Sequence, residues 1–139
     1  TLAQGIARGE KMDWILQKAT ELGVARIVPV ITDRTEVKLD AERAERRVAH
    51  WEAVVASACE QCGRSRLPEV CEPVKLGDWA ASLDDAAGLR LALDPEGERA
   101  PRDLPAGTRA GHFIRKKFMI FLPTPLMILL RKTSLEKNR

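Results

Sequence analysis

The sequence predicts an α/β fold with a parallel sheet, and three observations carry this prediction. Residues 40–64 repeat apolar side chains at the period of a long amphipathic helix. Residues 11–22 show the same period over a shorter stretch, and the β-branched run at residues 26–31 lies between the two helices. Because strand–helix–strand units join parallel strands through right-handed crossovers, this alternation indicates a parallel sheet. With 139 residues, one domain is the expected organisation.

The first element, residues 1–7, is predicted to be a short strand. An extended chain places Leu2, Gln4 and Ile6 on one face, and Gly5 interrupts the other face. Glycine has no side chain to pack, so it weakens a strand interior. We therefore expect this segment at an edge of the sheet.

The next two elements are a helix and a buried strand. The helix at residues 11–22 is followed by Gly23, which suits the position that closes a helix C-terminus. Residues 26–31 are apolar without alternation, as is typical of a parallel strand covered on both faces. Pro29 has no backbone N–H to donate, so it favours a sheet edge or a bulge.

The long helix at residues 40–64 has both of its ends written in the sequence. Asp40 is a suitable N-cap, because its carboxylate can accept from the backbone N–H groups of the first turn. Gly63 can adopt the left-handed conformation that ends a helix. The predicted buried stripe consists of Ala44, Val48, Trp51, Val55, Ala58 and Cys62.

Shorter elements follow. Residues 67–70 are predicted to be extended, residues 78–83 to form a short helix with Trp79 facing inward, and residues 89–93 to form another strand. Residues 98–107 contain two prolines and mixed charge, which indicates a loop. Residues 118–130 carry no charge, but two prolines interrupt them and they are too short for a membrane span of about 20 residues. They match neither a spanning helix nor a strand.

Charge divides the chain at about residue 110. Residues 111–139 hold seven Lys and Arg against one acid, a net charge of +6, although the whole chain carries only +3. Residues 1–110 are therefore net negative, and the total charge alone does not indicate nucleic-acid binding. We expect residues 111–139 to be an atypical basic and apolar tail.

The three cysteines indicate a reducing compartment. Cys59, Cys62 and Cys71 are an odd number and form no disulfide framework, so we expect a cytoplasmic protein. Cys59 and Cys62 form a C-x-x-C pair, which could be redox-active or supply half of the ligands of a zinc site. The pair lies within the predicted helix and no second pair exists, so roles in packing or on the helix surface are favoured and no metal is expected.

The candidate functional residues gather at the ends of the predicted elements. Arg34 follows the strand at residues 26–31, where it could grip a phosphate or pair with a neighbouring group. Glu60, Gln61 and Arg64 end the long helix together, either as a functional cluster or as a solvated helix end. The pattern by itself favours the structural interpretation.

Two segments closely resemble a known family. The run GEKMDWILQKATELGVARIVPVITDRTEVK and the later W-x6-ACEQCGRSRLPEV resemble the RsmE family of ribosomal RNA methyltransferases, with ELGV, DRTEVK and EQCGR in the family's order and spacing. The resemblance covers about residues 2–110. It implies a SPOUT fold, which is a parallel-sheet α/β domain with a trefoil knot, and a homodimer that methylates N3 of a uridine in small-subunit (16S) rRNA with S-adenosylmethionine.

The resemblance also assigns sides of the site. It implies that Arg34, Glu60, Gln61 and Arg64 lie on the side of the substrate RNA, and that Leu93, Asp94 and Pro95 belong to a loop on the cofactor side. Individual catalytic roles stay unassigned. Methylation at N3 requires the imide proton to be removed or its anion stabilised, and cations to hold the RNA backbone.

This chain also departs from the family's pattern. The pattern begins with a PUA-like RNA-binding domain, and after residue 110 it continues with a GPEGG loop and an LG-x-RILR-x-ETA segment, none of which is present. We expect residues 1–110 to be a partial SPOUT domain and residues 111–139 to be a frameshifted, fused or misannotated end. This chain is therefore expected to bind the cofactor weakly, and the alternative function is a non-catalytic RNA-binding or dimerisation fragment. A membrane is not an expected partner.

Overall fold

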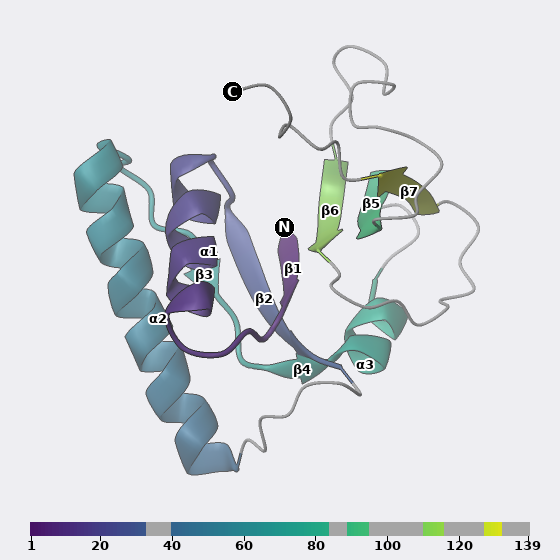
Figure 1. Ribbon diagram of the computed structural model, residues 1–139, viewed down its shortest axis with the longest axis horizontal. Coiled ribbons are helices and arrows are strands. Elements are labelled where there is room, and N and C mark those ends of the chain that lie inside the picture. The colour runs from purple at the N-terminus through teal and green to yellow at the C-terminus, as the bar shows by residue number, and fades with distance from the viewer. Residues whose placement is uncertain (33–39, 84–88, 95–109, 116–126, 132–139) are drawn as a thin grey trace, which may run out of the picture.

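The described strands all join one parallel sheet. The computed structural model describes residues 1–32, 40–83, 89–94, 110–115 and 127–131. Along the sheet the strands follow the order β3–β2–β1–β6–β5–β7, with β4 pairing β2 beside β3 (Figure 1). The strands are β1 (Leu2–Gly5), β2 (Arg26–Ile31), β3 (Glu69–Val70), β4 (Val74–Lys75), β5 (Leu89–Asp94), β6 (Ala110–Arg115) and β7 (Met127–Arg131). The predicted α/β fold with a parallel sheet is confirmed.

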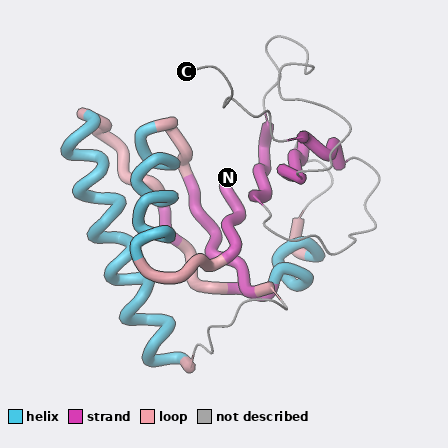
Figure 2. The backbone as a smooth tube through the Cα atoms, in the orientation of Figure 1, coloured by secondary structure: helices cyan, strands magenta, loops and turns pink. Residues whose placement is uncertain are grey.

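Helices cover both faces of the β1–β2 part of the sheet (Figure 2). The helices are α1 (Glu10–Glu21), α2 (Ala41–Cys62) and α3 (Leu76–Ala81). Leu2 and Ile27 pack in one apolar cluster with α1 and α2, whereas Ala3 and Val28 pack in a second cluster with Trp79 of α3. Because neighbouring residues of a strand point to opposite faces, the two clusters lie on opposite sides of the sheet.

The first strand does not lie at an edge, contrary to the expectation. β1 pairs with β2 on one side and with β6 on the other. Ala3 is fully buried and Leu2 nearly so, as expected for an inner strand. The prediction failed because the partner strand β6 lies more than a hundred residues away, at residues 110–115, and no local pattern announces that pairing.

Pro29 is accommodated inside the sheet without a bulge in β2. Ile27 O accepts from Cys71 N on the β3 side, and Val30 O accepts from Ile6 N on the β1 side. By alternation, the backbone of Pro29 faces the β3 and β4 side. There β3 pairs only as far as Ile27 and β4 starts at Val30, so the missing N–H of Pro29 faces the gap between two short strands. Pro29 therefore lies at neither a sheet edge nor a bulge but opposite the break between β3 and β4.

The ends of α2 are those that the sequence predicted. Asp40 Oδ1 accepts from Arg43 N at 2.8 Å, and Gly63 adopts the left-handed conformation at φ 72°. Trp51, Val55, Ala58 and Cys59 are buried, whereas Cys62 is exposed. The buried stripe therefore turns to Cys59 in the last turn of the helix.

Removing the Asp40 cap should weaken α2 measurably. We expect Asp40→Ala to lower the free energy of unfolding by about 1 kcal/mol, because an N–H of the first turn loses its acceptor. Asp40→Asn keeps an acceptor oxygen and should cost far less. Urea unfolding followed by circular dichroism measures both, and equal losses would show that the carboxylate charge rather than the cap matters.

The sheet continues beyond residue 110. Ala110–Arg115 form β6 between β1 and β5, and Met127–Arg131 form β7 beside β5. The expectation that residues 118–130 contain no strand is therefore wrong for residues 127–130. The expected trefoil knot would involve residues 95–109 and 116–126, which lie outside the described residues. Within the described ranges, no helix is long and apolar enough to cross a bilayer.

Candidate functional site

The carboxyl ends of the parallel strands line up along one end of the sheet, which we call the carboxyl edge; the opposite end, where the strands begin, is the amino edge. Open α/β sheets bind ligands at the carboxyl edge. Gln4 of β1, Arg115 of β6 and Leu93 of β5 are paired in one row across three neighbouring strands. Leu93 and Asp94, two of the expected cofactor-side residues, therefore end β5 at this edge. Their companion Pro95 and the substrate-side candidate Arg34 lie outside the described residues.

The other substrate-side candidates lie at the amino edge. α2 crosses back from the carboxyl end of β2 to the amino end of β3, so Glu60, Gln61 and Arg64 lie at the amino edge of the strands (Figure 1). A helix of 22 residues is about 33 Å long. Within one chain, the structure thus keeps these three residues apart from Leu93 and Asp94.

Arg64 holds the C-terminus of α1. Its Nη1 donates to Thr20 O at 2.7 Å and to Val24 O at 3.0 Å, and the side chain is partly buried. The last carbonyls of a helix have no partner within that helix, and a cation near them also complements the helix dipole. Arg64 therefore has a defined structural role, whereas Glu60 and Gln61 are exposed.

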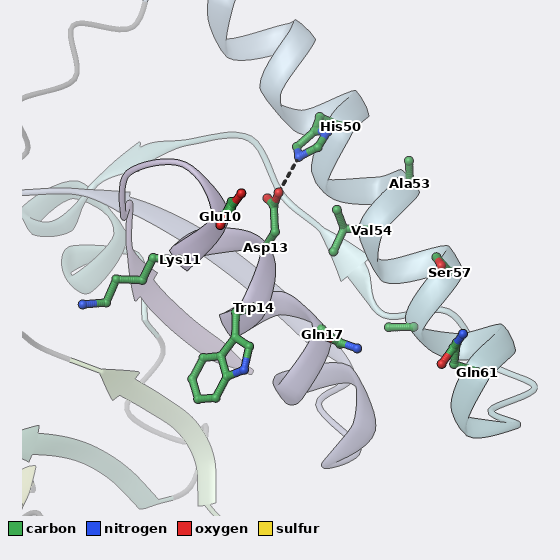
Figure 3. A pocket seen from close by; sticks show the side chains of 11 residues that line it. Glu10, Lys11, Asp13, Trp14, Gln17, His50, Ala53, Val54, Ser57 and Gln61 are labelled. Atoms are coloured by element: carbon green, nitrogen blue, oxygen red, sulfur yellow. Dashed lines mark hydrogen bonds and ion pairs between the residues drawn. The ribbon is translucent and has the colours of Figure 1, made fainter.

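A groove of about 880 Å³ runs between α1 and α2 on the surface of the helical layer. Figure 3 shows the groove, with His50 Nε2 2.9 Å from Asp13 Oδ2 across it and Trp14 pointing away from that pair. Trp14 is 55% exposed, whereas the other two tryptophans are buried. The lining consists of Glu10, Lys11, Asp13, Trp14, Gln17, His50, Ala53, Val54, Ser57, Ala58 and Gln61. Sequence reasoning missed this groove, apart from Gln61, because its two walls are separated along the chain.

Each cysteine side chain contacts a group of the described structure. Cys59 is buried, and its thiol lies 3.8 Å from the carbonyl oxygen of Arg66. The thiol of Cys62 lies 3.8 Å from the carbonyl oxygen of Cys59. Cys71 Sγ accepts from Arg26 Nε at 3.1 Å, and this hydrogen bond, assisted by nearby Glu69, raises the pKa of the guanidinium. In the described part of the chain, no three Cys, His, Asp or Glu side chains form a group that could hold a metal.

Gln4 is a second feature that sequence reasoning did not single out. Within residues 1–32 and 40–83, Gln4 and Thr20 are the buried polar residues. Thr20 Oγ1 donates to Leu16 O at 2.8 Å, and Gln4 Nε2 donates to Gly5 O at 2.8 Å. Gln4 Oε1, by contrast, is buried with no partner among the described residues. A lone glutamine in a short strand gives no sequence signal for such an atom.

Comparisons with known proteins agree on one family. A family model described as an RNA methyltransferase domain matches residues 1–120. The ribosomal RNA small subunit methyltransferase E of Bacillus subtilis is 37% identical over 71 residues, which cover 51% of this chain and 28% of that protein. The protein of the same description from Synechocystis is 34% identical over 91 residues, covering 66% of this chain and 29% of the relative. The match thus spans less than a third of the length of these two curated relatives.

Two solved structures resemble the fold closely. A crystal structure of ribosomal RNA small subunit methyltransferase E from Neisseria gonorrhoeae, bound to S-adenosyl methionine, has a TM-score of 0.74 at 36% identity. The match covers 82% of this chain and 47% of the Neisseria gonorrhoeae chain. A putative methyltransferase from Legionella pneumophila, in complex with the same cofactor, has a TM-score of 0.73 at 38% identity and covers 82% and 46%.

Proposed function

Because the chain belongs to the RNA methyltransferase domain family, we propose that it carries part of an enzyme that methylates N3 of a uridine in small-subunit ribosomal RNA. The observation that carries this proposal is the likeness, over 82% of the chain, to two structures bound to S-adenosyl methionine. The curated relatives, described as ribosomal RNA small subunit methyltransferases, support the substrate class.

The cofactor would supply an activated methyl group on a sulfonium. For this chain we propose that Leu93, Asp94 and Pro95 border the cofactor, and that Arg34, which follows β2 in the sequence, holds RNA phosphate. The buried acceptor of Gln4, at the carboxyl edge, fits a nucleoside that brings an N–H or O–H donor.

We also propose a cytoplasmic homodimer that contacts ribosomal RNA at more than one place. The exposed Glu60 and Gln61 lie at the amino edge, far from the proposed cofactor loop, and would contact a separate part of the RNA or a second subunit. Analytical ultracentrifugation tests the homodimer directly, and a monomer at all concentrations would contradict it.

Methyl transfer to small ribosomal subunits tests the proposal. The chain is incubated with subunits whose RNA lacks N3-methyluridine and with radiolabelled S-adenosylmethionine, and the nucleosides are then separated after digestion. Label in N3-methyluridine supports the enzyme. RNA retention without label supports the alternative, a non-catalytic RNA-binding or dimerisation fragment, and label in another nucleoside contradicts the proposed substrate.

Cofactor affinity is expected to be weak in this chain. Residues 111–139 carry no GPEGG loop of the kind found in the RsmE pattern, so less of the cofactor would be enclosed. Titration calorimetry with S-adenosylmethionine should therefore show no saturation below millimolar concentrations. Micromolar binding would contradict this expectation and would mean that the described edge holds most of the pocket.

A further inference from the structure

We propose that the end of β1, formed by Gln4 and Gly5, is a nucleoside-binding subsite in which Gln4 Oε1 accepts a hydrogen bond from an N–H or O–H group. Gln4 is only 6% exposed, and Oε1 has no partner within the described structure. Buried polar atoms are nearly always paired, so an unpaired one calls for a reason. The choice of a nucleoside rests on the proposed function, in which the methyl donor and the methylated uridine each contain one.

The orientation of the Gln4 amide is fixed by its neighbour. Nε2 donates to Gly5 O at 2.8 Å, and exchanging the nitrogen and oxygen would set two carbonyl oxygens against each other. The unpaired atom is therefore an acceptor, which selects a ligand group that donates. Nucleosides bring such donors as ribose hydroxyls and as base N–H groups.

Gly5 adds a second, independent observation at the same place. Its φ is not positive, and a Cβ built on Gly5 would meet no atom within 4 Å. Neither the backbone conformation nor the packing of the described residues therefore requires glycine here. Glycine in a strand often marks a place where a ligand approaches the backbone closely, and the open space beside Gly5 permits such an approach.

The position of β1 in the sheet agrees with a ligand site. From β1 the chain proceeds to β2 and β3 on one side, whereas β6 and β5 lie on the other, so the strand order reverses at β1. Ligands of open α/β sheets bind beyond the carboxyl ends of the strands at such a switch point. Gln4 also shares a row with Leu93, two strand spacings or about 10 Å away, which is within the length of a nucleoside and its substituent.

Nuclear magnetic resonance on the intact chain tests the subsite at millimolar affinity. The side-chain amide of Gln4 is followed while either uridine or S-adenosylhomocysteine is added. We expect a saturable shift of the Gln4 amide with one of them, and the ligand that causes it identifies the source of the nucleoside. No saturable shift with either ligand would overturn the proposal. Shifts confined to Gln17 and Trp14 would overturn it too, because they would place the nucleoside in the groove between α1 and α2.

Two variants separate binding from folding. Gln4→Met keeps the size of the side chain but removes both the acceptor and the Nε2 donor to Gly5 O, and we expect about tenfold weaker binding with only a small change in melting temperature. Gly5→Ala should fold normally and also bind more weakly, because its methyl group occupies the space for the ligand. The control Gln17→Met should leave the affinity unchanged. A lower melting temperature with unchanged affinity in Gln4→Met would show a purely structural glutamine and overturn the proposal.

The outcome is separable from that of the proposed function. A nucleoside that shifts Gln4 in a chain that methylates no RNA leaves the subsite standing and removes the enzyme. If Gln4→Met retains methyl transfer and its affinity for both ligands is unchanged, the proposed enzyme stands and the subsite is removed.

Discussion

Replacing Trp51 with alanine is expected to lower the free energy of unfolding by about 3–5 kcal/mol, a large share of the stability of a small domain. Trp51 is 2% exposed in the middle of α2, and it packs in the cluster that joins α2 to α1 and to Leu2 and Ile27 of the sheet. The truncation would leave a cavity between the helical layer and the sheet. Urea unfolding followed by circular dichroism measures the loss.

Two matched controls define this effect. Trp14→Ala removes the same side chain from a site that is 55% exposed, and Glu45→Ala changes the outer face of α2. Both should stay within about 1 kcal/mol of the unchanged protein. If Trp51→Ala and Trp14→Ala cost equally little, the stripe of α2 would not be the buried face, and the packing of α2 on the sheet would be wrong.

The helices were predictable because their signals are local. The Asp40 cap, the left-handed Gly63 and the buried Trp51 depend on residues within a few positions of one another, and each is confirmed. The place of β1 and the role of Pro29 depend on partners far along the chain, β6 in one case and the gap between β3 and β4 in the other. No periodicity carries that information, so both expectations failed.

The sequence supplies candidate site residues but not their arrangement in space. The sequence places Glu60, Gln61 and Arg64 together, and the structure keeps them together at the end of α2. Whether they face Leu93 and Asp94 depends on the direction in which α2 crosses the sheet, which the local sequence pattern does not reveal. The crossover puts them at the amino edge, whereas Leu93 and Asp94 end β5 at the carboxyl edge. Their proposed roles in RNA binding stay predictions.

Arg64→Ala is expected to lower the free energy of unfolding by about 2 kcal/mol, because Thr20 O and Val24 O would both lose a charged donor. Arg64→Lys should cost less, because both hydrogen bonds come from one nitrogen, Nη1, and the ammonium nitrogen of a lysine also has more than one N–H to donate. Arg66→Ala is the matched control, since Arg66 lies two residues further on with an exposed side chain, and it should change stability little.

Measured together, stability and RNA methylation decide which role of Arg64 dominates. A cap predicts a lower melting temperature in Arg64→Ala, with a loss of methylation only as large as the loss of folded protein. An RNA contact predicts the reverse, with methylation strongly reduced, the melting temperature unchanged and a salt dependence of RNA binding that becomes shallower. The hydrogen bonds to Thr20 O in the last turn of α1 and to Val24 O just beyond it favour the first result. An unchanged melting temperature together with reduced methylation would mean that those bonds contribute little to stability, and that the EQCGR segment serves the substrate rather than the fold.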